Sequence, residues 1–257
     1  MILLAEFPNL TDPAVITALL TLTVLEIILG VDNIIFISIV SNKLPEHQQP
    51  KARTIGLMLA MIFRIMLLFG ITWLIGLTKP IFTIGFIEEN GVPLGISWKD
   101  LILIAGGIFL VFKSTLEIHH KLEKEDKTKV KVAPAVFSAV ILQIVMVDAV
   151  FSFDSILTAI GLVDNVWIMI TAVVISMILM MLFAGPISRF INKHPTLQIL
   201  ALAFLILIGV LLVAEGFHQH LNKSYIYTAI AFSLVVELIN MRLRKKHELV
   251  DLNDDHL

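Results

Sequence analysis

The stretch LEIILGVDNIIFISIV, residues 25–40, is apolar enough to cross a lipid bilayer, yet Glu26, Asp32 and Asn33 interrupt it. An acidic side chain at the centre of a membrane helix costs about 2.5–3.5 kcal/mol on insertion scales, so it needs a partner, a cavity or an ion. This stretch therefore predicts a membrane-spanning helix whose polar residues have a function.

The composition of the whole chain also places it in a membrane. Of the 257 residues, 58% are hydrophobic and 16% are charged, whereas soluble domains are about half apolar and about one quarter charged. Long unbroken apolar runs favour helices over the alternating strands of a barrel. The absence of Cys excludes disulfides, thiolate metal sites and thiol catalysis. We expect an all-α membrane protein with a single membrane domain and seven spans, near residues 13–40, 54–77, 100–118, 134–160, 165–186, 196–216 and 224–241.

The distribution of Lys and Arg predicts the orientation of these spans. Basic residues gather between Lys121 and Lys131 and in the tail from Arg242 onward, whereas residues 1–12 contain none. Loops rich in Lys and Arg stay on the cytoplasmic side of a membrane. We therefore expect the N-terminus outside and the tail, residues 242–257, in the cytoplasm.

A second charged stretch, VDAVFSFDSILTAI at residues 147–160, repeats the pattern of the first. Each copy has an acid, five apolar or small residues, a second acid and a short side chain with an oxygen: Glu26, Asp32 and Asn33, then Asp148, Asp154 and Ser155. Each copy opens a set of three spans, and three is odd, so the second set starts on the opposite side of the membrane. This predicts two inverted three-helix repeats, 13–118 and 134–216, plus a C-terminal helix at 224–241, as in many secondary transporters.

Helical spacing places part of each motif on one face. Residues seven apart stack, so Glu26 lies above Asn33, and Asp148 above Ser155. Asp32 points elsewhere if its helix is regular, and unwinding near Gly30 would bring it to the same point. The second copy has no Gly at the equivalent place, which makes a break there less expected.

The oxygen-bearing side chains of the two motifs suit a hard divalent cation such as Mn²⁺, Mg²⁺ or Ca²⁺. Four acids against Arg64 and Lys113 leave an intramembrane charge of −2, which one such ion balances. We expect Arg64 to be a charge partner or gate, and Lys113 either to neutralise an acid or to reach the membrane surface. The predicted metal ligands are Glu26, Asp32, Asn33, Asp148, Asp154 and Ser155, with no permanently bound cofactor.

Two further acids, Glu117 and Glu215, stand near the ends of predicted spans, and each is followed by two histidines. Either group could form a metal-entry site. Their places beside loops favour solvated residues instead.

At these residues the sequence resembles the TerC family of integral membrane proteins, particularly its short YgdQ-like branch. The segments that carry the resemblance are LEIILGVDN (25–33), FRIMLLFG (63–70), GGIFLVFK (106–113) and VDAVFSFDS (147–155). The resemblance implies a bacterial inner-membrane transporter of divalent metal ions, with manganese efflux as the first choice. Its partners would be the cation and the bilayer, with no nucleic acid, and a homo-oligomer is compatible with it.

Two other classes of function remain open. Two membrane aspartates that share a proton can activate water, as in an intramembrane aspartyl-type hydrolase. The acids occur here as four in a duplicated pattern and no Gly-x-Gly-Asp is present, which favours a transporter over an enzyme. The third class is an accessory membrane protein that senses or delivers metal.

Overall fold

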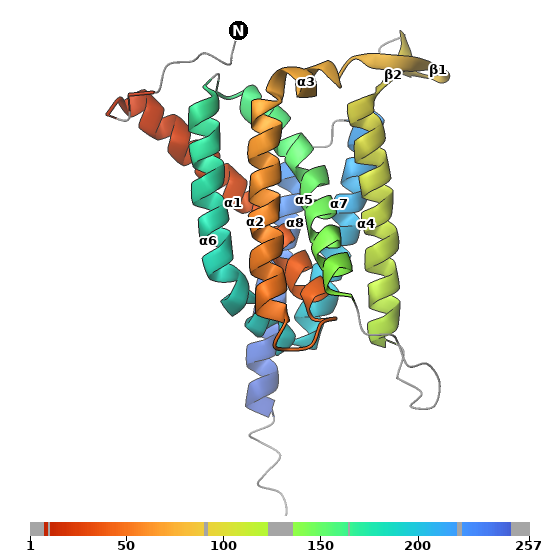
Figure 1. The fold of residues 1–257 in the computed structure, drawn as a ribbon. Helices are drawn as coiled ribbons and strands as arrows, with labels where there is room; N and C mark the ends of the chain where they lie inside the picture. Colours follow the sequence, from red (N-terminus) through yellow and green to blue (C-terminus); the bar gives the residue numbers. More distant parts are fainter. Residues whose placement is uncertain are drawn as a thin grey trace, which may run out of the picture.

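A bundle of seven long helices forms this computed structural model, which describes residues 8–9, 11–89, 92–122, 136–163, 165–219 and 223–247. Each of the seven is long and apolar enough to cross a membrane, as predicted. In chain order they are α1 (Pro13–Ser41), α2 (Gln49–Phe69), α4 (Trp98–Leu122), α5 (Phe137–Ile160), α6 (Val166–Asn192), α7 (Pro195–Gly216) and α8 (Lys223–His247). Figure 1 shows them gathered into one bundle.

The second span differs from the predicted 54–77. Helix α2 begins five residues earlier, at Gln49, and ends at Phe69, where Gly70 caps it. The remaining apolar residues form the short helix α3 (Ile71–Gly76). The predicted run therefore continued past the real helix end, because hydropathy registers the apolar residues of α3 but not the change of direction at Gly70.

A two-stranded antiparallel hairpin follows α3, made of β1 (Pro80–Glu89) and β2 (Val92–Ser97). Helix α3 and this hairpin lie across one end of the bundle (Figure 1), which we call the hairpin end. The hairpin leads directly into α4, whose start carries a capping box. The Asp100 Oδ2 atom accepts hydrogen bonds from the Ser97 backbone N at 2.8 Å and from Ser97 Oγ at 2.6 Å.

Helices α4 and α7 approach each other most closely, at Gly107 and Gly209. A Cβ atom at Gly107 would lie 2.5 Å from the carbonyl oxygen of Gly209, and one at Gly209 would lie 2.8 Å from the carbonyl oxygen of Gly107. Only glycine permits this backbone contact, which is typical of membrane helices. The contact is reciprocal and joins the third helix of each predicted repeat.

Helix α1 is unbroken from Pro13 to Ser41, so the predicted unwinding near Gly30 is wrong. Gly30 is buried against α6, where a Cβ atom would lie 2.3 Å from the Met180 sulfur. The glycine thus serves close packing of two helices instead of a break. Helix α5 is likewise continuous through the second motif.

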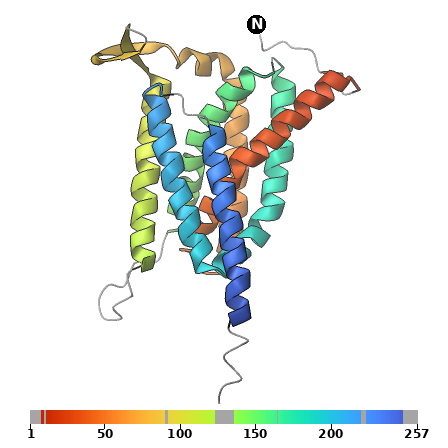
Figure 2. The same ribbon diagram turned by 180° about the vertical axis from the view of Figure 1, so that it is seen from behind.

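Helix α8 stands at the outside of the bundle, whereas the tilted helix α1 packs against α5, α6 and α7. Figure 2 shows α1 crossing the bundle at a steep tilt, with α8 standing beside α7. No described side chain of α8 is buried, whereas nine side chains of α5 are buried. Helix α8 therefore presents most of its surface to lipid in a membrane.

Candidate functional site

Arg64, on α2, lies in the middle of the bundle with only 2% of its surface exposed. Its Nη1 atom donates to Glu26 Oε2 on α1. Its Nε and Nη2 atoms donate to the two carboxylate oxygens of Asp148 on α5, at 3.0 and 2.9 Å. The paired contact to Asp148 is the strong two-bond geometry of arginine and carboxylate. Arg64 therefore joins the first acid of both motifs.

Two neutral side chains complete the contacts of Asp148. Asn33 Nδ2 donates to Asp148 Oδ1 at 3.0 Å, and Ser152 Oγ approaches Oδ2 at 3.0 Å. Asn33 belongs to the first motif, so it crosses from α1 to the acid of the second motif. We call Glu26, Asn33, Arg64, Asp148 and Ser152 the Arg64 cluster; all five are buried.

The charges of the Arg64 cluster do not balance when both acids are ionised. One guanidinium stands between two carboxylates, which leaves a net charge of −1. Taking charges out of water costs several kcal/mol per ion, and this cost is recovered only when the partners are well placed. The position between Glu26 and Asp148 is therefore one where the protein stabilises positive charge inside the bundle.

The end of the second motif lines a small cavity next to this cluster. Asp154 and Ser155 face it together with Arg64, and two residues from other helices, Glu215 on α7 and Tyr227 on α8, complete its polar wall. The cavity measures about 30 Å³, which is room for one or two water-sized ligands. The remaining walls are apolar: Leu29, Phe151, Ile208, Leu211 and Leu212.

A broad groove between α1, α5 and α8 leads to this cavity. It measures about 620 Å³ and shares Leu29, Asp154 and Tyr227 with the cavity wall. Its other lining residues are apolar or threonine, so Asp154 is the only charged side chain that lines it. The cavity is therefore reached past Asp154 and Tyr227.

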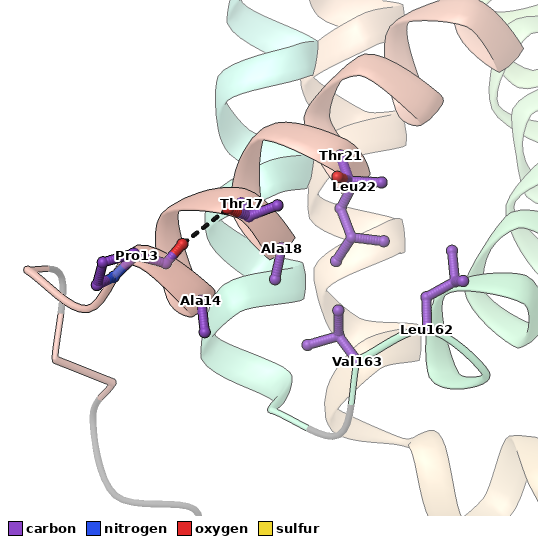
Figure 3. Close-up of a pocket in the computed structure, with 8 residues that line it drawn as sticks. All are labelled: Pro13, Ala14, Thr17, Ala18, Thr21, Leu22, Leu162 and Val163. Carbon is purple, nitrogen blue, oxygen red and sulfur yellow. Dashed lines mark hydrogen bonds between the residues drawn. The ribbon is translucent and has the colours of Figure 1, made fainter.

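A second groove, at the start of α1, has no comparable chemistry. Figure 3 shows the eight residues that line it, from α1 and from the turn after α5, and none of them is charged. The one hydrogen bond drawn joins Thr17 Oγ1 to the carbonyl oxygen of Pro13, within the first turn of α1. We therefore place the candidate site at the Arg64 cluster and its cavity.

Lys113 is not part of this site. It lines a separate small pocket with Gln143 and Glu117, near the end of the bundle opposite the hairpin. Within the described part of the chain it has no ion pair, so the prediction that it neutralises one of the motif acids finds no support. Glu117 lies inside α4, as its predicted span places it, but its side chain is only 14% exposed and pairs with Lys43, so the expectation of a solvated residue is wrong.

The fourth motif acid, Asp32, cannot be placed in the site, because its side chain lies outside the described residues, although α1 runs through it. The described His, Asp and Glu side chains, which do not include Asp32, form no group of three or more that could hold a metal ion. The six predicted metal ligands therefore remain a prediction.

Sequence reasoning missed Ser152 and Tyr227 and did not place Glu215 at the site. Ser152 stands four residues after Asp148 and so shares its helix face, a spacing that could have revealed it. Glu215 was predicted near the end of a span, as a solvated residue or part of an entry site, and it lies within α7 and lines the cavity. No pattern in the sequence marks Tyr227.

Comparison with known proteins covers the part of the chain that contains these site residues. The pattern described as "Integral membrane protein TerC family" matches residues 11–248. The chain is 46% identical over 243 residues to the inner membrane protein YgdQ of Escherichia coli K12, covering 95% of this chain and 99% of that protein. A UPF0053 protein of Haemophilus influenzae is also 46% identical, over 93% of this chain and 98% of its own length.

Other relatives are longer. The inner membrane protein YoaE of Escherichia coli K12 is 47% identical over 237 residues, which are 92% of this chain and 44% of YoaE. The chain thus spans less than half the length of several curated relatives that it matches. No solved structure matches it.

Proposed function

Because the chain belongs to the TerC family of integral membrane proteins, we propose that it carries a divalent metal ion across the inner membrane. Mn²⁺ is the first candidate, and Mg²⁺ and Ca²⁺ share its ligand chemistry. The acids of the two motifs would bind the ion near the middle of the bundle. Transport is proposed to run outward, as efflux.

The observation that carries this proposal is the buried Arg64 cluster. A guanidinium held between Glu26 and Asp148 is a positive charge attached to the protein, at a place where two helices bring acids together. A structural ion pair alone would need one acid for one base. The second acid and the adjacent cavity with Asp154 favour a site that exchanges one positive charge for another.

The same geometry suggests how the ion is released. In the empty protein Arg64 compensates the acids, and a divalent cation that enters would compete with the guanidinium for the same carboxylates. Metal binding requires deprotonated acids, so the carboxylates could take up protons when the ion leaves. Exchange of a metal ion for protons is therefore the coupling we propose.

The arrangement is less suited to hydrolysis. Two carboxylates that share a proton must be in direct contact. The Arg64 guanidinium instead pairs with both Glu26 and Asp148, so each of these acids faces a positive charge. We therefore keep transport as the proposed function.

Flux measurements on the purified full chain in proteoliposomes test the proposal. We expect Mn²⁺ to cross the wild-type vesicles and Glu26→Gln to abolish this flux. Asp12→Asn is the matched control, because this exposed acid of the same helix only caps it, and Asn caps equally well. Absence of flux for Mn²⁺, Mg²⁺ and Ca²⁺ in the wild type would refute transport, and binding without flux would indicate an accessory metal protein.

Cysteine labelling tests the proposed orientation, since the chain has no Cys of its own. Thr83, in the hairpin, and His120, near the end of α4, are both exposed and lie at opposite ends of the bundle. We expect Thr83→Cys to react with an impermeant reagent from outside and His120→Cys only from the cytoplasm. The reverse pattern would invert the proposed topology.

A further inference from the structure

We propose that Glu215, on α7, is a ligand of the transported cation and acts together with Asp154. This inference rests on the proposed transport function and adds a residue from outside the two motifs. It assigns the small cavity beside Arg64 as the place where the ion is bound on the hairpin side of the cluster.

The first support is the position of Glu215. It and Asp154 come from different helices, α7 and α5, and line the same cavity of about 30 Å³. Ser155, which is 3% exposed, adds a hydroxyl oxygen to the same wall. Two carboxylates and a hydroxyl around a space of that size are a set of oxygen ligands for one hard cation with one or two waters.

The second support is electrostatic. Arg64 is the only basic residue among the ten that line the cavity, and its guanidinium is already bonded to Glu26 and Asp148. Asp154 and Glu215 therefore add negative charge to a region whose one base is already shared by two acids. Apart from Ser155 and Tyr227 the other lining residues are apolar, so screening by solvent is weaker than in water and the attraction for a cation is stronger.

The third support is a comparison of α7 with α4. Their reciprocal glycine contact sets Gly209 opposite Gly107, and Glu215 and Lys113 each stand six residues after their glycine. Equivalent positions of the two helices therefore carry opposite charges. At this position an acid faces the cavity on the hairpin side, whereas a base faces the pocket at the opposite end, where the lining acid Glu117 is already paired with Lys43. The cavity on the hairpin side is therefore the one with an excess of acids.

Mn²⁺ titration of the purified full chain, followed by its melting temperature, tests this assignment. A ligand that binds only the folded protein raises the melting temperature with concentration, and the midpoint reports affinity. Glu215→Gln and Glu215→Ala should raise the Mn²⁺ concentration for half-maximal stabilisation at least tenfold. Glu117→Gln is the matched control, the same change on α4, and should leave that concentration as in the wild type.

The outcomes separate this inference from the transport proposal. Wild-type Mn²⁺ affinity in either folded Glu215 variant, beside a lost response in Asp154→Asn, would overturn the role of Glu215 and leave the motif site standing. A lower melting temperature without Mn²⁺ but an unchanged midpoint would also overturn it, because that is the effect of a structural residue. A wild-type protein that responds to none of Mn²⁺, Mg²⁺ and Ca²⁺ would overturn both proposals.

Discussion

Glu26 and Asp148 hold the same place in the two motifs, but the structure gives them different surroundings. The Asp148 carboxylate receives two hydrogen bonds from Arg64 and one from Asn33. The Ser152 hydroxyl donates to the Asp148 backbone carbonyl oxygen at 2.6 Å and lies 3.0 Å from the carboxylate. Glu26 has a single contact, with Arg64, among the described residues. Sequence repetition therefore paired the two acids, but it did not predict that one is held by more hydrogen bonds than the other.

The difference arises from the residues that end each motif. Asn33 is long enough to reach from α1 to Asp148 on α5. Its counterpart Ser155 is shorter and donates to the carbonyl oxygen of Ser152 on its own helix, at 3.3 Å. The first motif thus supports the acid of the second, and the second gives no such support in return. We infer that Glu26 releases Arg64 when it binds the transported ion. Asp148 stays hydrogen-bonded to Arg64 and holds it in place.

The largest effect is expected from removing the base that both acids share. Arg64→Leu leaves Glu26 and Asp148 buried without a cation, and breaking a buried pair in this way costs about 3–5 kcal/mol. We expect a large fall in melting temperature or no folded protein. Arg64→Lys keeps the charge but loses the two-bond geometry, so it should fall between Arg64→Leu and the wild type. A fully stable Arg64→Leu would mean that the acids are neutral and would remove the basis of the comparison.

A smaller effect separates the two acids directly. Asp148→Asn weakens the hydrogen bonds from Arg64 and Asn33 and should destabilise the protein by about 3 kcal/mol or more, because each hydrogen bond to a charged group contributes about 1.5–3 kcal/mol. Glu26→Gln removes one charged contact and should cost about 1.5–3 kcal/mol. The measurement is unfolding of both variants under identical conditions. Equal losses of stability would show that the two acids are held alike, contrary to our interpretation.

The smallest effect concerns the serine that supports Asp148. Ser152→Ala removes one hydrogen bond and should cost about 0.5–1.5 kcal/mol. Ser155→Ala is the control at the end of the same motif, and its long 3.3 Å bond should make the loss smaller still. Melting temperatures of the two variants decide the order. A larger loss in Ser155→Ala would place the support of the second motif at the cavity instead of at Asp148.

Composition was enough to predict the seven spans, and charge led to the expectation that Arg64 is a charge partner or gate. Apolar length determines membrane helices, and a buried guanidinium must find an acid. Helix ends were less predictable: Gly70 ends α2 although apolar residues continue, and Pro186 lies inside α6, which runs on to Asn192. The hairpin was predicted only as a loop, because its pairing depends on two segments that meet in space.

The partners of the site could be predicted only in part. Spacing along one helix predicts shared faces, such as Asp148 with Ser155, but not which residue crosses from another helix. Asn33 reaching Asp148 and Glu215 reaching the cavity both depend on how α1, α5 and α7 pack. The predicted unwinding at Gly30 was wrong for the same reason. A glycine is needed there because Met180 of another helix leaves no room for a Cβ atom.

Manganese flux through proteoliposomes that carry Asp32→Asn, Asp154→Asn or both is the most direct test of the transport site. If the two acids belong to one ion site, each single change should abolish flux while the melting temperature stays close to that of the wild type. The double variant should then be no worse than either single one, because residues that act as one unit are not additive. If Asp154→Asn retains manganese flux while Asp32→Asn has none, the second motif does not bind the ion, and this result would contradict the shared site.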